Sequence, residues 1–274
     1  MTWNGEWFPS GRAEHRAAPA VEAAAIREAG KMIRESLAKA DGGATNDVII
    51  SLCEMRDKET VESLVKAIGR EGLELAIISQ YRRRDRFDWQ QNAILTTLPV
   101  VKASWSRWQN HKAETPPRGY AYAEIAVEPA VTARVYSVHL KSNYGQTTDE
   151  RHKTDVAKRT HAVEQILEQE KPMRGKTEAP VIVAGDFNAD AWSEDFADEK
   201  IFALFKDAKF VDVLESVPEG SRITHPGRGR WAGSTLDYIM VRDLRPEKVL
   251  ITDSLGLSDH SPVMTVLAEG KSQE

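Results

Sequence analysis

The segment Val181-Ile182-Val183-Ala184-Gly185-Asp186-Phe187-Asn188 holds the clearest structural signal in the chain. Its first four residues form an unbroken apolar run, which is typical of a strand buried on both faces of a sheet. The run ends at Asp186, and Asn188 follows two residues later. In α/β proteins the loops beyond strand ends are where sites assemble, so we expect both polar side chains at such an edge.

The same arrangement recurs elsewhere in the sequence. The mostly apolar run 47–53 ends at Glu54, Asp237 lies in a late strand candidate, and Asp259-His260 follows Leu257-Ser258. A single Asp after a strand is usually a turn former or a helix cap. Several polar residues at the ends of apolar strands are instead better explained by one shared site.

Helical and strand patterns surround these positions. Residues 12–40 are helical in composition, with Pro19 expected near the start of the main helix, because a proline inside a helix removes a backbone donor. Segments 57–69 and 149–170 carry apolar stripes at helical spacing. Further strands are expected at 73–79, 92–97, 119–127, 132–140, 236–241, 248–251 and 263–267. Because several strands follow one another without helices, a layered α/β sandwich with mixed sheets is predicted.

Composition narrows the function classes. The 274 residues hold 37 Lys and Arg against 42 Asp and Glu, a net charge of −5, which argues against a wholly basic nucleic-acid binder and leaves room for a local basic face. The single cysteine, Cys53, excludes a disulfide framework and a cysteine-built zinc site. No apolar stretch approaches the roughly 20 residues of a membrane span.

The organisation of the whole chain is also predicted. We find no linker that would separate two units, so residues 1–274 are expected to form a single catalytic domain, as a monomer without a stable protein partner. One cysteine and the absence of a signal-peptide pattern favour the cytoplasm, and a leader removed from the N-terminus would change this to a secreted or periplasmic location.

In this order along the chain, the motifs resemble those of the endonuclease/exonuclease/phosphatase superfamily, which has the deoxyribonuclease I-like fold. The resemblance implies a four-layer α/β/β/α sandwich with two mixed β-sheets packed face to face, and metal-dependent hydrolysis of phosphate esters. The matching segments are 2–6 (TWNGE), 52–54 (LCE), 136–142 (YSVHLKS), 185–188 (GDFN), 236–238 (LDY) and 258–260 (SDH).

The chemistry of phosphodiester cleavage explains these residue types. The anionic ester repels a nucleophile, so cleavage needs charge neutralisation and an activated water. Carboxylate and amide oxygens suit a hard cation, Mg²⁺ or alternatively Mn²⁺. The resemblance makes Glu54 the first candidate ligand, with Asn4 positioning it or joining through water and Asp259 completing the site. Glu6 has two interpretations, a second metal contact or a solvated strand residue.

The remaining motif residues are assigned to catalysis by the same resemblance. His260 would contact the scissile phosphate or act in acid–base chemistry, with Asp237 orienting its imidazole. Asp186 would align or deprotonate the attacking water, Asn188 would hold the phosphate, and His139 would hydrogen-bond to it. Whether Asp186 or His260 is the general base stays open, because geometry decides that question before pKa does.

Two arginine-rich segments bear on the substrate. Residues 81–89 place four arginines among three aromatic residues, and residues 225–231 contain Arg228, Arg230 and Trp231. Arginine and aromatic side chains together suit phosphate backbones and bases, which favours DNA as the substrate. An arginine loop held by salt bridges against the core is the structural alternative.

Three functional hypotheses remain at this stage. The first is a nuclease, with Lys141 and Asn143 as further phosphate contacts. The alternative for Lys141 is an ordinary surface lysine. The second is a phosphatase or phospholipase-type phosphodiesterase that acts on a small or lipid phosphate, such as an inositol phosphate or sphingomyelin. Its lipid form predicts an exposed apolar or aromatic loop for membrane contact, and the sequence shows no clear candidate for one. The third, a catalytically inactive binding module, is disfavoured because every motif residue is present.

Overall fold

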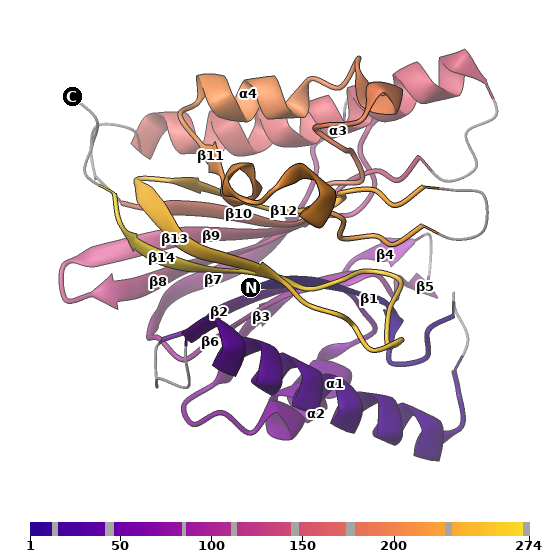
Figure 1. The fold of residues 1–274 in the computed structure, drawn as a ribbon, viewed down its shortest axis with the longest axis vertical. Helices are drawn as coiled ribbons and strands as arrows, with labels where there is room; N and C mark the ends of the chain where they lie inside the picture. Colours follow the sequence, from indigo (N-terminus) through magenta and orange to yellow (C-terminus); the bar gives the residue numbers. More distant parts are fainter. Residues whose placement is uncertain are drawn as a thin grey trace.

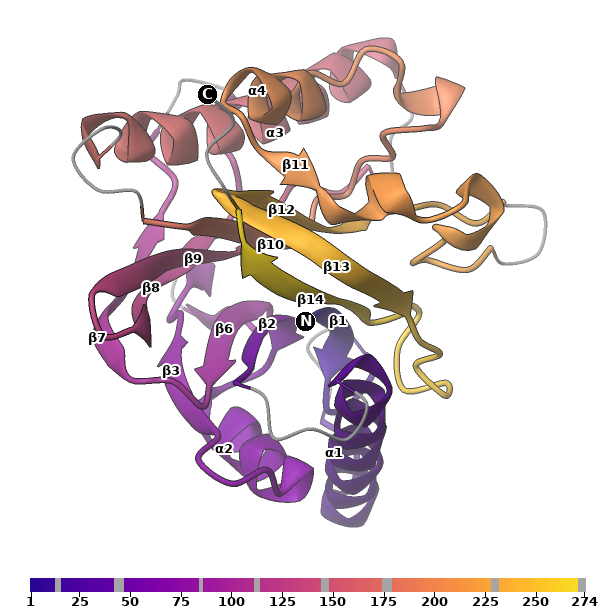
Figure 2. The ribbon, with the colours of Figure 1, turned by 60° about the vertical axis from the view of Figure 1, so that its left-hand side comes forward.

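Two six-stranded β-sheets lie face to face, and a pair of helices covers the outer face of each (Figures 1 and 2). This is the four-layer α/β/β/α sandwich expected from the sequence. No helix in the part of the chain described here is long and apolar enough to cross a membrane. The computed structural model describes residues 1–12, 16–41, 47–83, 86–110, 114–143, 148–173, 179–227 and 232–270.

The first sheet combines the two ends of the chain. Its strand order is β13-β14-β1-β2-β6-β3, with β1 and β2 parallel and the other neighbours antiparallel. Helices α1 (Pro19–Asp41) and α2 (Lys58–Ile68) cover it (Figure 2). The strands are β1 (Thr2–Phe8), β2 (Ile49–Met55), β3 (Glu74–Ile78), β6 (Gln91–Thr96), β13 (Leu244–Ile251) and β14 (Val263–Glu269).

The second sheet has the order β11-β12-β10-β9-β8-β7 and is covered by α3 (Asp149–Glu170) and α4 (Ile201–Asp207). Strands β9 and β10 are parallel, and the other neighbours are antiparallel. Both sheets are therefore mixed, as predicted. The strands are β7 (Val100–Arg107), β8 (Gly119–Glu128), β9 (Val131–His139), β10 (Val181–Asp186), β11 (Val211–Asp212) and β12 (Asp237–Arg242).

Local sequence signals account for the element boundaries. Helix α1 starts at Pro19, as expected. Helix α2 follows Asp57, whose Oδ1 accepts the Thr60 backbone N–H at 2.8 Å, and ends at Gly69 in the left-handed conformation, with φ 64°. The paired strands predicted at 119–127 and 132–140 are β8 and β9.

The sequence patterns did not predict strands β4 (Arg82–Arg83), β5 (Arg86–Phe87), β7 and β11 or helix α4. Strand β7 is an edge strand with most of its residues exposed, so it lacks the apolar alternation of a half-buried strand. Helix α4 has only seven residues, too few for a clear periodicity. The arginine-rich segment has no apolar strand pattern, but β4 and β5 pair there antiparallel.

The strand directions bring many connections to one end of the sandwich. Strands β1, β2, β9 and β10 all end there, and β12, antiparallel to β10, begins there. The described connecting residues 79–83, 86–90, 140–143 and 252–262 consequently meet at this end, which we call the site end. The strand termini that carry the motif residues therefore converge although they lie far apart in sequence.

Candidate active site

Sheet register aligns three motif residues of the second sheet. Asp186 at the end of β10 pairs with His139 of β9 on one side and with Asp237 of β12 on the other. From the first sheet, the buried Asn4 donates from Nδ2 to Asp186 Oδ2 at 2.9 Å and to Glu54 Oε1 at 3.2 Å. Asn4 therefore links the acids of both sheets, and the distant motifs form a single cluster.

Asp237 holds His260 beside Asp186. His260 Nδ1 lies 2.7 Å from Asp237 Oδ2, while its Nε2 lies 3.9 Å from Asp186 Oδ2 and 3.8 Å from Asp259 Oδ1. Burial disfavours the imidazolium, but the negative charges of Asp237 and Asp186 outweigh it and raise the pKa of His260 to about 10. The geometry thus points Nε2 into the site and favours the protonated ring.

Asp186 lies at the centre of the cluster. Burial, reinforced by the charges of Asp237 and Glu54, raises the pKa of Asp186, against the opposing effects of His260 and the Asn4 hydrogen bond. Its Oδ1 accepts the backbone N–H of Asn188 at 2.9 Å. Asp186 is consequently a carboxylate whose charge is costly, as expected of a proton acceptor.

His139 and Asn188 complete this side of the cluster. His139 Nε2 lies 3.4 Å from Asp186 Oδ2 and 3.7 Å from Glu54 Oε1. Burial and the nearby Arg118 guanidinium lower the pKa of His139 well below its usual value, which favours the neutral ring. Asn188 adopts a positive φ of 53° and donates from Nδ2 to the Leu140 carbonyl at 3.3 Å.

Backbone strain is concentrated beside these side chains. Glu6, Trp7 and Glu54 have φ angles of 49°, 56° and 58°, in the left-handed region that non-glycine residues seldom occupy. The strained turn lets the Trp7 N–H donate to Glu54 Oε2 at 3.1 Å, and the Glu6 N–H donate to Asn4 Oδ1 at 3.0 Å. Such strain often clusters at functional sites, and here it orients the first candidate metal ligand.

The donor set fits a divalent cation. Glu54, Asp186 and Asp237 are buried acids in one cluster, and Asp237 Oδ1 has no hydrogen-bond partner among the described residues. Ligand atoms of Glu54, His139 and Asp186 lie within 4.8 Å of one another. A cation would neutralise this accumulated negative charge, and carboxylate oxygens are ligands that hard cations prefer.

Glu6 and Asp259 lie at the rim of the same cluster. Glu6 Oε2 accepts the backbone N–H of Asp259 at 3.0 Å. Burial, with the nearby charges of Asp259 and Glu54, raises the pKa of Glu6. Glu6 is therefore close to both other candidate ligands, and its role as a metal contact stays a prediction.

Two predicted substrate contacts, Lys141 and Asn143, are bonded to helix α3. Lys141 Nζ forms an ion pair with the buried Asp155 Oδ2 of α3 at 3.2 Å, and Asn143 Oδ1 accepts from Arg159 Nη1 at 2.6 Å. Both residues follow His139 at the site end, but these polar atoms are engaged by α3. Arg228, Arg230 and Trp231 lie outside the described residues.

Two residues near the cluster were missed by sequence reasoning. Arg118 donates to the carbonyls of His139 at 3.2 Å and Leu140 at 2.7 Å, and so supports the end of β9. His225 Nε2 lies 3.5 Å from Asp259 Oδ2, and its ring centre is 5.0 Å from that of His260. Neither stands in a motif, because their contacts arise from chain crossings that local sequence does not reveal.

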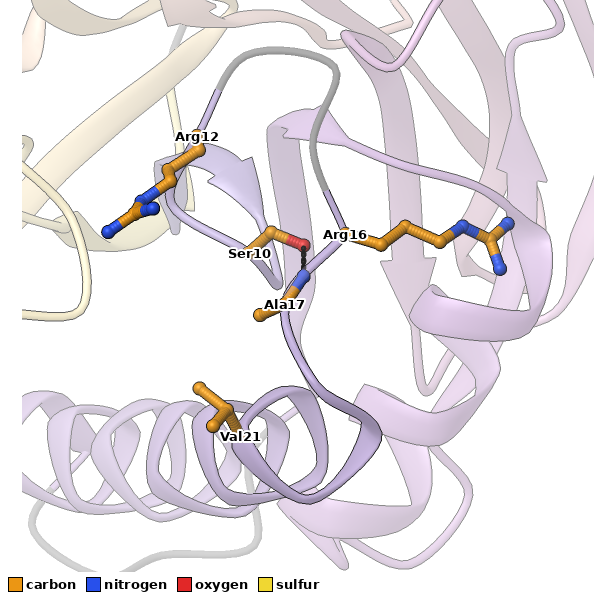
Figure 3. A pocket seen from close by; sticks show the side chains of 5 residues that line it. All are labelled: Ser10, Arg12, Arg16, Ala17 and Val21. Carbon is orange, nitrogen blue, oxygen red and sulfur yellow. Dashed lines mark hydrogen bonds between the residues drawn. The ribbon is translucent and has the colours of Figure 1, made fainter.

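A cavity of about 420 Å³ lies beside the start of α1. Figure 3 shows Arg12 and Arg16 extending in opposite directions from it, while Ser10 donates to Glu22 at 2.8 Å. The two guanidinium groups therefore do not converge on one anion, and none of the motif residues lines this cavity. Its lining residues are Ser10, Arg12, Arg16, Ala17 and Val21.

Solved structures share the fold at low sequence identity. An endonuclease/exonuclease/phosphatase from Beutenbergia cavernae aligns with a TM-score of 0.67 and 14% identity, covering 98% of this chain and 70% of that one. D. rerio TDP2 complexed with a single-strand DNA product gives 0.60 and 14%, covering 97% of both chains. Sphingomyelinase C from Streptomyces griseocarneus gives 0.58 and 18%, covering 98% of both.

Family-level comparison covers nearly the whole chain. No protein with a curated description matches the sequence. The model of the Endonuclease/Exonuclease/phosphatase family matches residues 1–260, a range that contains every motif residue of the cluster. The chain therefore belongs to the endonuclease/exonuclease/phosphatase family, whose members are hydrolytic, metal-dependent phosphoesterases.

Proposed function

We propose that this protein is a divalent-metal-dependent nuclease that cleaves DNA phosphodiesters with an activated water, and that Mg²⁺ is its cation. The observation that carries the hydrolytic part is the buried cluster in which Asn4 joins Glu54 to Asp186 while Asp237 holds His260. Such a set of acids and imidazoles supplies both charge neutralisation and proton transfer for an anionic ester.

The roles follow from the contacts. Glu54 would hold the cation, with Asn4, Glu6 and Asp259 as further contacts, and the bound cation would neutralise charge on the phosphate. Asp186 takes the proton of the attacking water, because its raised pKa makes it a better base than an ordinary carboxylate. His260, protonated and oriented by Asp237, contacts the phosphate or leaving oxygen with Nε2.

The phosphate itself would be held by neighbouring donors. Asn188 and His139 lie beside Asp186 and can offer hydrogen bonds to phosphate oxygens. Asn143 and Lys141 stand further along the same connection, and binding through them would require exchange of their present α3 contacts. We therefore assign these two residues to the outer part of the substrate path.

DNA is preferred as the substrate for two reasons. The paired strands β4 and β5 belong to the connection between β3 and β6, whose described residues 79–83 and 86–90 lie at the site end, and the sequence there is rich in arginine and aromatic residues. A structure with the same fold, D. rerio TDP2, is described as complexed with a single-strand DNA product. Binding driven by phosphate contacts should weaken steeply as salt rises, because counterions are released.

A lipid phosphodiester is the second candidate. Leu255, in the connection 252–262 at the site end, is 62% exposed, and Ile223 is 43% exposed. Exposed apolar side chains beside a phosphoesterase site suit contact with a membrane surface. Sphingomyelinase C from Streptomyces griseocarneus shares the fold. This candidate predicts turnover of sphingomyelin vesicles and weak salt dependence.

A substrate panel distinguishes the candidates. We expect cleavage of duplex, single-stranded or abasic DNA with Mg²⁺, loss of cleavage with chelator, and little turnover of RNA, inositol phosphates or sphingomyelin. His260→Ala should abolish turnover while the circular dichroism spectrum stays native, and His161→Ala, on the outer helix α3, should cleave normally. Hydrolysis of sphingomyelin but not DNA would transfer the assignment to the lipid candidate, and full activity of His260→Ala would refute the site.

A further inference from the structure

Two imidazoles and a carboxylate meet at the mouth of the cluster. His225 precedes the segment that leads to β12, whereas Asp259 and His260 belong to the connection between β13 and β14. Asp259 Oδ2 lies 3.5 Å from His225 Nε2, and Asp259 Oδ1 lies 3.8 Å from His260 Nε2. Each of the three residues offers one potential ligand atom, and these atoms lie within 4.8 Å of one another. The family motif accounts for Asp259 and His260 but has no part for His225.

The hydrogen bond between His260 and Asp237 also suits a metal-bound histidine. His260 Nδ1 is bonded to the buried Asp237 at 2.7 Å, so the tautomer and ring orientation are fixed and Nε2 faces Asp259. A carboxylate on the far nitrogen is the usual support of a metal-bound histidine, because it orients the ring and raises its basicity. His225 is only partly exposed, and its Nε2 lies 3.5 Å from Asp259 Oδ2, so the third donor is also close to the carboxylate.

Donor type separates this group from the Glu54 cluster. Imidazole nitrogens favour borderline ions such as Zn²⁺, whereas carboxylate and amide oxygens favour Mg²⁺. In a tetrahedral Zn²⁺ site with bonds of about 2.1 Å, neighbouring ligand atoms are about 3.4 Å apart. His225 Nε2 is 3.5 Å from Asp259 Oδ2, and His260 Nε2 is 3.8 Å from Asp259 Oδ1, so each imidazole is near this separation from one of the two carboxylate oxygens. One ion can therefore be held by both rings if the carboxylate offers both oxygens or rotates to present one of them.

We propose that His225, Asp259 and His260 form a second metal site for a borderline transition-metal ion such as Zn²⁺, and that an ion bound there blocks hydrolysis. Inhibition follows because Nε2 of His260 would be coordinated and no longer available to the phosphate, while Asp259 would be withdrawn from the Mg²⁺ side. Coordination also requires Nε2 to release its proton, so Zn²⁺ competes with that proton. The inhibition rests on the proposed function, whereas the binding does not.

Calorimetry tests the binding without reference to activity. Zn²⁺ is titrated into the protein of residues 1–274 in excess Mg²⁺, which should occupy the Glu54 side. We expect one Zn²⁺ per chain, with affinity reduced more than about 100-fold by His225→Ala and by His225→Gln. The matched control is His161→Ala, since His161 is also a partly exposed histidine beside carboxylates, Glu114 at 3.0 Å and Glu164 at 3.1 Å. Equal affinity in wild type and either His225 variant would overturn the site, as would the lack of any bound Zn²⁺.

A spectroscopic measurement checks the ligand set. Co²⁺ in place of Zn²⁺ should give visible absorption bands typical of a tetrahedral site with imidazole ligands, and these bands should be lost in His225→Gln. The circular dichroism spectrum and the unfolding midpoint of this variant establish that its fold is intact. Unchanged Co²⁺ bands in a folded His225→Gln protein would contradict ligation by His225.

Activity measurements then test the inhibition. With Mg²⁺ in excess, Zn²⁺ should suppress DNA cleavage by wild type and by His161→Ala. For His225→Gln, each rate is compared with the rate of the same variant without Zn²⁺, and the same fractional inhibition should need at least a tenfold higher Zn²⁺ concentration than for wild type. Inhibition at the same concentration in His225→Gln would overturn the regulatory part. If wild type cleaves no phosphodiester, the proposed function fails, and the calorimetric result alone decides whether the metal site exists.

Discussion

Asp237 illustrates how single side chains set the chemistry of this site. It is fully buried, its backbone N–H donates to Thr224 Oγ1 at 3.0 Å, and Oδ2 faces His260 Nδ1. A buried carboxylate is costly unless a partner compensates it, and the imidazolium of His260 is that partner. The same pairing keeps Nε2 of His260 directed at the substrate space, so stability and catalysis depend on one contact.

Replacement of Asp237 by Asn tests this pairing. Asp237→Asn preserves the shape but removes the charge that stabilises the imidazolium, so the pKa of His260 should fall from about 10 and kcat should drop at least about 100-fold. Histidine NMR titration and steady-state kinetics with Mg²⁺ measure the two effects. A lowered pKa with unchanged kcat would show that protonated His260 is not needed for turnover.

Asp212 gives a pH-dependent stability that is independent of catalysis. Burial raises its pKa to about 7, although Oδ1 accepts the Leu214 backbone N–H at 2.9 Å. Between its ordinary value and about 7, the folded state retains a proton that the unfolded state has lost. The free energy of unfolding therefore falls as pH rises through this interval, by an amount on the order of a few kcal/mol.

Asp212→Asn should remove this pH dependence while keeping the hydrogen-bond acceptor for Leu214. We expect the variant to be more stable than wild type at pH 8 and to lose this advantage near pH 4, as measured by urea unfolding across the pH range. Asp207→Asn, at an exposed position at the end of α4, is the control and should show no such trend. A constant difference between Asp212→Asn and wild type would contradict the assignment.

Among the elements, the parallel pair β9 and β10 positions most of the catalytic groups. Gly185 in β10 has a φ of 151°, and a Cβ there would lie 1.8 Å from the Val138 carbonyl oxygen of β9. Only glycine permits this close approach, and the residues immediately following Val138 and Gly185 are His139 and Asp186. The spacing of these two side chains is thus set by backbone contact between strands.

Gly185→Ala should force the two strands apart. We expect a loss of at least about 2 kcal/mol in the free energy of unfolding and a marked loss of activity in the protein that still folds, since His139 and Asp186 would separate. Gly220→Ala is the matched control, because nothing lies within 4 Å of a Cβ there. Wild-type stability in Gly185→Ala would show that the strands can adjust without cost.

Helix α3 supports the same strands from outside. At its C-terminal end, the buried Glu170 accepts hydrogen bonds from Arg134 of β9 at 2.8 Å and Arg242 of β12 at 2.9 Å. Nearer its N-terminus, the fully buried Arg159 donates to the Lys141 carbonyl at 2.8 Å and pairs with Glu199. The helix therefore fixes both the far end of β9 and the segment that follows His139.

For the molecule as a whole, the site exists only because two sheets face each other. Asn4 and Glu54 come from the first sheet, and His139, Asp186 and Asp237 from the second. The sheets also share polar contacts, such as the Ser51 to Ser137 hydroxyl hydrogen bond of 2.8 Å. We propose on this basis that residues 1–274 form one catalytic domain that unfolds in a single transition.

Mg²⁺ should stabilise this whole assembly through the site. Binding to the folded state alone adds about 2.7 kcal/mol at 100 times Kd, which corresponds to a rise of roughly 5–10 °C in Tm for a chain of this size. Thermal unfolding with Mg²⁺ and with chelator measures it. Glu54→Gln should abolish most of the shift, whereas Glu62→Gln, exposed on α2, should retain it. An unchanged shift in Glu54→Gln would exclude Glu54 as the main ligand.

Strand and helix placement followed from local patterns. The apolar run 181–186 and the stripe in 149–170 could be read directly, because burial imposes periodicity on neighbouring residues. The motif order was sufficient to predict the layered fold and the residues that cluster, including Asn4, Glu54 and His260. Strand β7 could not be predicted in this way, because most of its residues are exposed and need not be apolar.

The composition and order of the chain therefore determine its family, its layers and the identity of the clustered acids. The contacts of Arg118 and His225, the α3 partners of Lys141 and the distances around Asp186 emerge only when the two sheets pack together. These contacts join residues far apart in sequence, and their protonation depends on burial and on the charges of neighbours brought there by folding. Local sequence patterns do not show which distant residues will be neighbours, so the electrostatics of the site are set by packing.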